Sequence, residues 1–389
     1  MNRPLGAPLR VCVFGTFRRT YSRNAIMLEG LRRAGVEVME VHVPLWRGIE
    51  DRVNAVTGGW KRPAFWFRLL RVYGTLLRRW WPVRHSVDVL VCAYPGHFDI
   101  YLARVLAWVT RKPLAWDVFM STWLIARERG LHKRSGAFVA LLRRIEWLAL
   151  RLPDLLVIDT AHYARWFEQT HGIPASRFSL VPTGADSDRF QSGVARPRRT
   201  GQPCEVLYYG SYIPNHGVPA IIGAAALLAD ESDIHFTLIG DGPDRPAAEA
   251  EAQRRDLANI SFIPWLEQSE LVEVISRADL CLGAFGDTPQ SMMTVQNKLY
   301  ECLAMGKAVL SGESPAVRAA LVAGKEIALC PRLDPAALAE SVRTLCADGP
   351  LRAALGAAGH IRFSADYTIE RIGALYAAAL DGLARRAGG

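Results

Sequence analysis

The sequence lacks the patterns that mark several classes of protein. Its seven cysteines are scattered singly with no C-x-x-C pair, which argues against a structural zinc site and a disulfide framework. No uncharged apolar run reaches transmembrane length, and the N-terminal stretch has no apolar region long enough for a signal peptide. We therefore expect a protein of the reducing cytoplasm that does not span the membrane.

Acidic residues are missing from one long stretch, since residues 52–87 contain no Asp or Glu. Residues 1–200 carry 32 Lys and Arg against 15 Asp and Glu, a net charge of +17, whereas the remainder carries 15 against 23, a net charge of −8. A basic first half joined to an acidic second half suggests that the halves face different partners. No zinc finger or aromatic RNA-binding motif accompanies the positive charge, so nucleic acid is not expected as a partner.

Buried-strand runs alternate with helical stretches, and 389 residues are long for one core, so we expect two α/β domains with doubly wound parallel sheets. Residues 1–190 form the expected N-terminal domain, the polar segment 191–203 a linker and residues 204–365 the C-terminal domain. Residues 366–389 are expected to form a helix that packs back on the first domain. The expected strands are 9–15, 37–44, 88–94, 112–119, 154–160 and 178–184, then 205–211, 234–243, 260–265, 279–285 and 308–310.

The stretch "NKLYECLAMGKAVL", residues 297–310, predicts a short helix, a glycine stop at Gly306 and a buried strand. Lys298 and Glu301 are three residues apart and so share a helix face. A cation and a carboxylate would then point together from a helix start near the carboxyl end of a strand. The alternative is an ordinary surface ion pair.

The second half resembles a known family. "LIGDGP" at 238–243, the segment up to "DLCLGAF" at 279–285, and then "NKLYECLAMGKAVL" are similar to the nucleotide-sugar domain of GT-B glycosyltransferases, family 4 in particular. "LVPTGADSDRF", residues 180–190, resembles the segment that ends the first domain of that family. The resemblance implies the GT-B fold, two Rossmann-like domains facing across a cleft, with a nucleoside diphosphate sugar on the second domain and the acceptor on the first. No D-x-D signature ends a strand, so no metal and no other cofactor is expected.

The resemblance also implies roles for residues of the second domain. Glu301 would accept hydrogen bonds from the ribose hydroxyls, and Lys298 would lie beside the diphosphate at a helix N-terminus. Trp265 has the alternative of a packed hinge residue, and Asp241 that of a plain turn residue. The expected donor-binding residues are Gly210, Ser211, His216, Asp241, Ile263, Trp265, Asn297, Lys298 and Glu301.

Two departures from the family pattern stand out. Met293 occupies the place of the first glutamate of the Glu-x7-Glu pair, which in the family contacts the donor sugar. Ser211 and His216 stand where the family has Arg and Lys after the first strand of this domain. His216 is only partly cationic near neutral pH, so Lys298 is expected to carry more of the diphosphate charge.

In the first domain, residues that follow strands are candidates for acceptor binding and catalysis. The loop "GTFRRTYSRN" offers Gly15, Arg18, Arg23 and Asn24 to phosphate or sugar oxygens, with a solvated turn as the alternative. The resemblance points to Asp117 and His97 as candidates close to the reacting carbon. A buried, hydrogen-bonded histidine is the alternative for His97.

Residues 64–81 predict a basic amphipathic helix. Its expected apolar face consists of Trp66, Leu69, Leu70, Tyr73, Leu77 and Trp80, and its polar face of Arg68, Arg71, Thr75, Arg78 and Arg79. Such a helix suits an anionic membrane surface, and packing on the domain core is the alternative.

The combined prediction is a glycosyltransferase that moves a sugar from a nucleoside diphosphate sugar to an acceptor hydroxyl. The resemblance implies retention at the anomeric carbon, and the basic half favours a sugar or lipid-linked acceptor in cell-envelope polysaccharide or glycolipid synthesis, at the inner face of the membrane. A sugar-nucleotide epimerase of the same fold and a non-catalytic sugar-nucleotide-binding subunit are the alternatives, the latter because of Met293 and His216.

Overall fold

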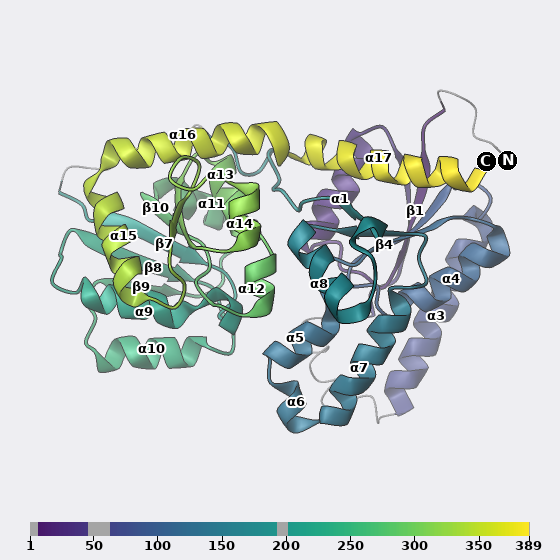
Figure 1. Ribbon diagram of the computed structural model, residues 1–389, viewed down its shortest axis with the longest axis horizontal. Coiled ribbons are helices and arrows are strands. Elements are labelled where there is room, and N and C mark those ends of the chain that lie inside the picture. Colours follow the sequence, from purple (N-terminus) through teal and green to yellow (C-terminus); the bar gives the residue numbers. More distant parts are fainter. Residues whose placement is uncertain (1–6, 46–62, 193–200, 389) are drawn as a thin grey trace. The chain divides into compact units, whose positions relative to one another are not determined.

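The computed structural model describes residues 7–45, 63–192 and 201–388, which form two compact units (Figure 1). Unit 1 consists of Met1–Thr183 together with Ile369–Gly389, and unit 2 of Gly184–Thr368. The division falls between Thr183 and Gly184, ahead of the linker expected at 191–203, of which residues 193–200 lie outside the described residues.

Unit 1 is built on six parallel strands in the order β2-β1-β3-β4-β5-β6. These runs are apolar because both faces of a parallel sheet are covered by helices. The strands are β1 (Arg10–Gly15), β2 (Glu37–His42), β3 (Val89–Cys92), β4 (Leu114–Asp117), β5 (Leu155–Ile158) and β6 (Phe178–Leu180). The helices are α1 (Ser22–Arg33), α3 (Pro63–Val83), α4 (Asp99–Thr110), α5 (Thr122–Glu128), α6 (Leu131–Arg134), α7 (Gly136–Ala149), α8 (Ala161–His171) and α17 (Ile369–Gly388).

Unit 2 repeats the plan with the order β12-β11-β10-β7-β8-β9. The chain reverses direction across the sheet between β7 and β10, and ligands of such sheets bind at this point, outside the carboxyl ends of the strands. The strands are β7 (Cys204–Tyr209), β8 (Ile234–Ile239), β9 (Ile260–Ile263), β10 (Leu280–Leu282), β11 (Ala308–Gly312) and β12 (Ala328–Cys330). The helices are α9 (Val218–Leu227), α10 (Arg245–Arg254), α11 (Gln268–Arg277), α12 (Pro289–Met293), α13 (Asn297–Ala304), α14 (Pro315–Ala320), α15 (Pro335–Ala347) and α16 (Gly349–Asp366), with a 3-10 turn η3 at Pro214–His216.

The two doubly wound parallel sheets confirm the predicted fold class. The stretch 297–310 also has its predicted local structure: α13 ends before Gly306, which has a positive φ of 67°, and β11 follows. Among the described residues, the structure contains no helix whose length and apolarity would let it cross a bilayer.

Helix α3 differs from its expected amphipathic pattern, because it has two apolar stripes. Val72, Leu76 and Trp80 are buried against unit 1, so Trp80 belongs to the packed side. Trp66, Leu70, Leu77 and Trp81 are at least 41% exposed and follow each other at helical spacings of four and seven residues. The expected single apolar face is therefore wrong, since the core takes one stripe and leaves the other at the surface.

The C-terminal helix α17 packs on α1 in unit 1, and two glycines allow the close approach. A Cβ built on Gly373 would lie 2.0 Å from the carbonyl oxygen of Gly30, and one on Gly30 would lie 2.8 Å from the Cα of Gly373. The two helix backbones are thus in direct contact, which no side chain at either position would permit.

We predict opposite effects for the same substitution at two glycines of α17. Gly373→Ala should lower the free energy of unfolding by about 1–3 kcal/mol, because the methyl group overpacks against α1. Gly382→Ala is the matched control: its Cβ meets no atom closer than 3.5 Å, so helix propensity should make it neutral or stabilising by up to about 1 kcal/mol. Urea unfolding measures both, and a Gly373→Ala variant as stable as Gly382→Ala would contradict the close contact.

Candidate donor and acceptor site

The donor-site candidates of unit 2 gather where β7 ends. Gly210 follows Tyr209 with a φ of 142°, a conformation that favours glycine. A Cβ built on Gly210 would lie 3.0 Å from Lys298 Nζ and 3.3 Å from the His216 ring carbon Cε1. Absence of a side chain at Gly210 therefore lets the lysine ammonium and the imidazole meet above the end of the central strand.

Lys298 is the least satisfied group of this cluster. It is 6% exposed, and its Nζ has no hydrogen-bond partner and no carboxylate within ion-pair distance in the described structure. The ammonium lies 4.0 Å from the centre of the Tyr208 ring, a cation–π contact that offsets part of the lost hydration. Burial lowers the pKa of Lys298 to about 7, although nearby Cys302 and Glu301 oppose the shift.

Glu301 stands one turn further along α13 and is held by Tyr209, whose hydroxyl donates to Oε2 at 2.7 Å. Burial raises the pKa of Glu301, against the hydrogen bond from Tyr209 and the charge of Lys298. The Tyr209 hydroxyl fixes one carboxylate oxygen, and no hydrogen bond to Oε1 is found in the described part of the chain. A fixed carboxylate with one uncommitted oxygen suits a hydroxyl donor such as a ribose diol.

The His216 imidazole is fixed by Tyr208. The Tyr208 hydroxyl donates to the Ser211 carbonyl at 3.0 Å, so it accepts from His216 Nδ1 at 2.9 Å. This arrangement places the proton of the neutral ring on Nδ1 and leaves Nε2 as the atom that would gain a second proton. Burial, reinforced by the charge of Lys298, lowers the pKa of His216 well below its usual value. His216 is therefore neutral near pH 7.

The remaining donor-site candidates lie at neighbouring strand ends or on α13. Asp241 follows β8, is exposed, and accepts a hydrogen bond from the Gly242 backbone within its own turn. The Ile263 carbonyl accepts from Gly240 N at 3.1 Å, whereas Trp265 is 64% exposed. Asn297 begins α13, half-buried. Met293, at the place of the first glutamate of the Glu-x7-Glu pattern, is buried in α12 and offers no carboxylate.

Two residues that hold this site were not singled out from the sequence. Tyr208 and Tyr209 are consecutive in β7, and their hydroxyls bond His216 and Glu301 respectively. The available signal was a pair of hydroxyl-bearing aromatics at the end of an otherwise apolar strand, directly before a glycine.

In unit 1 the expected acceptor residues are engaged in holding the protein together. Arg23 is fully buried, forms a two-pronged ion pair with Asp117 at 2.7–2.9 Å, and donates to the Val181 carbonyl and the Thr183 hydroxyl. Asn24 is 2% exposed and donates to the carbonyls of Arg18 and Tyr94.

These contacts correct the expectation that Arg23 and Asn24 face an acceptor, because their donors are already used. Asp117, proposed as catalytic, is likewise 2% exposed and committed to Arg23. Gly15 has a φ of 132°, and a Cβ there would lie 2.6 Å from Asp99 Oδ2, so its neighbour is a carboxylate of the protein itself. Arg18 is half-buried beside this loop.

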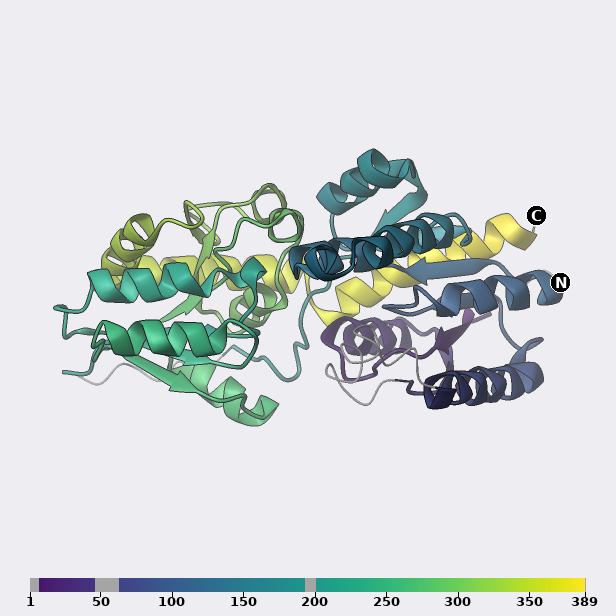
Figure 2. The same cartoon turned by 90° about the horizontal axis from the view of Figure 1, so that it is seen from below.

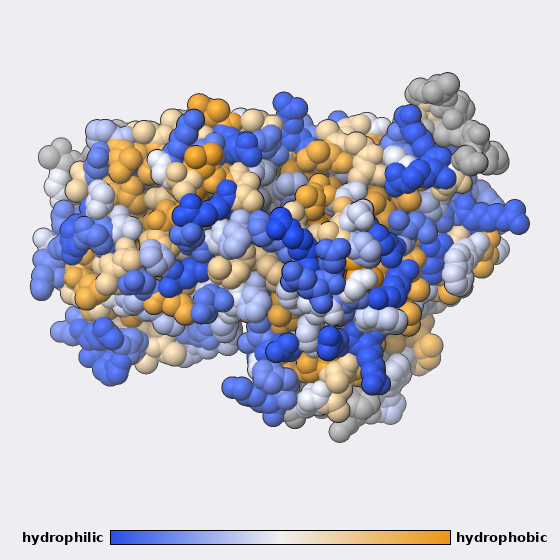
Figure 3. All heavy atoms as spheres, in the orientation of Figure 1, coloured by the Kyte–Doolittle hydropathy of each residue, from blue (hydrophilic) through white to orange (hydrophobic). Residues whose placement is uncertain are grey.

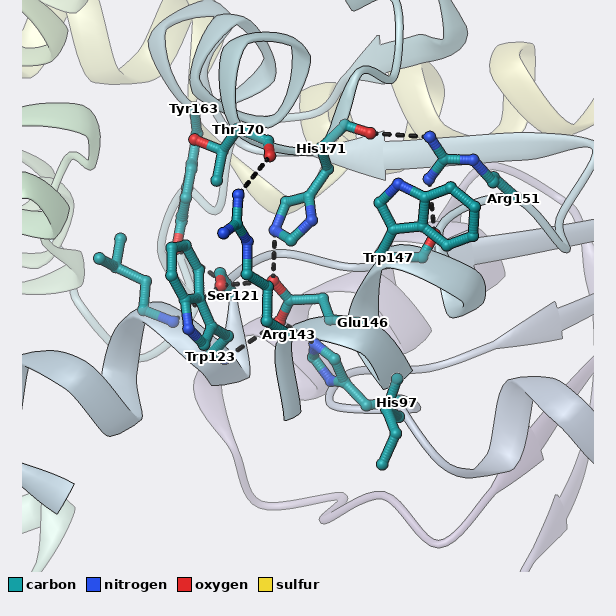
Figure 4. A network of polar contacts seen from close by, with 12 residues as sticks. His97, Ser121, Trp123, Arg143, Glu146, Trp147, Arg151, Tyr163, Thr170 and His171 are labelled. Carbon is teal, nitrogen blue, oxygen red and sulfur yellow. Dashed lines mark hydrogen bonds and ion pairs between the residues drawn. The ribbon is translucent and has the colours of Figure 1, made fainter. Parts of the chain in front are cut away.

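His97 belongs to the buried network of Figure 4, which is centred on Glu146 of α7. His97 Nε2 lies 3.4 Å and His171 Nε2 3.1 Å from the Glu146 carboxylate, and the Ser121 hydroxyl donates to it at 2.6 Å. Burial opposes the charge of Glu146, but the bonds from His171 and His97 outweigh it and lower the pKa of Glu146 to about 2. His97 lies just before α4, is 4% exposed and faces Glu146 of α7, so the structure favours the alternative of a buried histidine over the expected catalytic role.

Two Rossmann-like units, each with a six-stranded parallel sheet, make up the GT-B fold. Residues 203–348 match the family model described as glycosyl transferases, group 1. The match lies within unit 2, Gly184–Thr368, so the resemblance to group 1 glycosyltransferases is confirmed for this unit.

Relatives and solved structures are consistent with this assignment. The D-inositol 3-phosphate glycosyltransferase of Geodermatophilus obscurus is 26% identical over 314 residues, covering 75% of this chain and 68% of that protein. That of Thermomonospora curvata is 24% identical over 320 residues, covering 74% and 73%. Sucrose-phosphate synthase of Thermosynechococcus elongatus shares the fold with a TM-score of 0.72 at 15% identity, over 97% of this chain and 98% of that one. HepE of Anabaena in complex with UDP gives 0.70 at 13% identity, over 97% and 100%.

We predict that removing the Lys298 charge stabilises the free protein in a pH-dependent way. The folded-state pKa of about 7 lies below the ordinary lysine value of 10.5, so between these values the unfolded chain binds more protons and stability rises with pH. Lys298→Met should therefore unfold at a higher temperature than the native protein at pH 7, with a difference that shrinks towards pH 10. Lys325→Met, at an exposed position, is the control. A Lys298→Met difference that stays constant with pH would contradict the burial of a charged group.

Proposed function

We propose that this glycosyltransferase binds the diphosphate of a nucleoside diphosphate sugar with Lys298 and the ribose with Glu301, and transfers the sugar with retention. The observation that carries the proposal is the buried Lys298 ammonium without an anionic partner, above Gly210 at the end of β7. A diphosphate in that place would supply the missing negative charge, and the free N–H groups at the start of α13 would add to it.

The groups next to Lys298 also support its proposed role in binding the diphosphate. His216 is neutral near pH 7, which leaves Lys298 as the principal cation for the leaving diphosphate. A diphosphate favours the protonated lysine, so donor binding should draw a proton onto Lys298. Catalysis would come from placing donor and acceptor and from stabilising the leaving diphosphate, the terms that dominate when no covalent intermediate is needed.

A screen of nucleotide sugars by mass spectrometry would identify the donor, and UDP sugars are the first probes to use. UDP is the nucleotide bound in the solved complex of HepE, whose fold this chain shares. Ser211 and His216 at the places of the family's Arg and Lys leave less positive charge there, so affinity for a bare diphosphate should depend on Lys298 more than on any other side chain.

We propose that the acceptor is a sugar or lipid-linked hydroxyl used in cell-envelope polysaccharide or glycolipid synthesis, and that the protein works at an anionic membrane surface. The outward stripe of α3 supports this, since Trp66, Leu70, Leu77 and Trp81 are exposed beside Arg71 and Arg78. Exposed tryptophan and arginine on one helix suit the boundary between lipid headgroups and acyl chains.

An inositol phosphate is the second candidate acceptor. The observation that favours it is the similarity, at 24–26% identity, to D-inositol 3-phosphate glycosyltransferases. Transfer assays with inositol phosphate and with a membrane lipid extract as alternative acceptors separate the two, because only one of them should yield a glycosylated product.

We predict that Glu301→Ala loses roughly 1.5–3 kcal/mol of donor binding, the range for hydrogen bonds to charged groups. Lys298→Met should weaken the diphosphate alone, measured with UDP by calorimetry, and should abolish the proton uptake that accompanies binding. Glu340→Ala, on α15 in an exposed ion pair with Arg343, is the matched control. Unchanged affinity in both Glu301→Ala and Lys298→Met would refute the donor assignment.

We predict that the double variant Arg71→Glu with Arg78→Glu releases the protein from vesicles containing phosphatidylglycerol. Each arginine near an anionic surface contributes about 1 kcal/mol, and added salt weakens this contribution. The double variant Arg385→Glu with Arg386→Glu on α17 controls for net charge. Native protein that stays unbound at low salt would disprove the membrane contact, as would an α3 variant that still binds.

A further inference from the structure

The exposed apolar residues of unit 1 are concentrated on three helices. Of nineteen large hydrophobic residues found exposed in the described structure, twelve lie on α3, α4 with its N-cap, or α7, so they are not random scatter. We name them the apolar face: Trp66, Phe67, Leu70, Leu77, Trp81, Phe98, Val105, Trp108, Val109, Leu141, Trp147 and Leu148. Orange residues reach the surface at the lower right of Figure 3, where Figure 1 places α3 and α4.

The three helices are neighbours in one layer. The Tyr73 hydroxyl of α3 donates to Asp99 of α4 at 2.8 Å, and the Tyr101 hydroxyl of α4 donates to the Ile145 carbonyl of α7 at 2.6 Å. Right-handed crossovers along the strand order β2-β1-β3-β4-β5 put all three on the same side of the sheet. In the view of Figure 2 they lie in front of the unit 1 sheet. The residues of the apolar face therefore lie on neighbouring helices of one layer.

The charges on these helices all favour an anionic partner. They contain two carboxylates, Asp99 and Glu146, and both are buried and hydrogen-bonded. The exposed charged side chains on the three helices are Arg71, Arg78, Arg79, Arg143 and Arg144. A protein partner with mixed charges would find no acid here to pair with its own lysines and arginines, whereas anionic lipid headgroups need none.

Each helix also presents a tryptophan stacked with an arginine. The guanidinium carbon lies 4.0 Å from the ring centre for Arg84 over Trp81, 5.3 Å for Arg104 over Trp108, and 3.7 Å for Arg151 over Trp147. All three tryptophans are near the C-terminal ends of their helices, which in a parallel α/β unit lie at the same edge of the sheet. Tryptophan with a cation beside it is the side-chain combination that bilayer interfaces favour.

We propose that α3, α4 and α7 together form a broad docking face for an anionic lipid bilayer, with Trp81, Trp108 and Trp147 at the headgroup level. The proposal rests on the membrane contact of α3 suggested under the proposed function and extends it: unit 1 would lie on the bilayer through three helices instead of being tethered by one. Lipid contact by α4 and α7 is the new element, and neither helix was distinguished by composition alone.

The test uses the full chain and vesicles of phosphatidylglycerol mixed with phosphatidylcholine, or of phosphatidylcholine alone. The variant Trp108→Ala with Trp147→Ala leaves α3 intact and removes two exposed indoles whose burial in lipid should favour binding. It should reduce binding to the anionic vesicles about tenfold or more at low salt. Leu180→Ala with Leu375→Ala removes two similarly exposed side chains of unit 1 outside this face and should bind as the native protein does.

Two results would overturn the proposal. The first is native-like vesicle binding by Trp108→Ala with Trp147→Ala, which would confine the contact to α3. The second is a concentration-dependent dimer in light scattering that the same variant abolishes, which would make the face a subunit interface. Retained binding of UDP and an unchanged unfolding transition verify that the variant is folded. Vesicle binding is measured without any transfer reaction, so its result does not depend on whether the proposed acceptor is correct.

Discussion

Lys298 is a buried ammonium with no carboxylate within ion-pair distance among the described residues, and this is the constraint on which the candidate site of the C-terminal unit depends. Lys298 gives up its hydration at the end of β7 and receives in return a cation–π contact with Tyr208. The cation–π contact does not fully replace the lost hydration, and the pKa of Lys298 is therefore lowered to about 7. A fold tolerates such a group where a ligand completes it, and under the proposed function the diphosphate of a sugar nucleotide would supply the opposite charge.

The neighbours of Lys298 limit both crowding and electrostatic repulsion at its ammonium. Gly210 keeps the space above the strand end open, and the Tyr208 hydroxyl fixes His216 as a neutral neighbour that does not repel the ammonium. Tyr209 in the next position restrains Glu301. Tyr208 and Tyr209 are adjacent in β7 and so point to opposite faces of the sheet, where they orient His216 and Glu301 respectively.

Unit 1 has the same kind of sheet as unit 2, but several of the buried polar groups near its strand ends are paired with one another. Its strand ends carry several buried charged or polar groups, but Arg23, Asp117, Asn24 and Asp99 satisfy one another or the local backbone. The loops at that edge are thereby held without a ligand. The helices of unit 1 leave tryptophans and arginines exposed, in keeping with the basic first half of the chain.

The sequence by itself determined the two parallel sheets, because strands covered on both faces are continuous apolar runs, and it determined the local geometry of α13, because Lys298 and Glu301 are three residues apart. Contacts between distant positions were decided only by the tertiary structure. Arg23 meets Asp117 across 94 residues and Asn24 meets Tyr94 across 70, so no local pattern could show that these donors were already used. Likewise the composition of α3 predicts an amphipathic helix, but the packing of Val72, Leu76 and Trp80 against unit 1 selects which of its two apolar stripes is left for the surface. Local spacing determines which side chains share a helix face, and only packing against neighbouring elements determines which of these faces is buried.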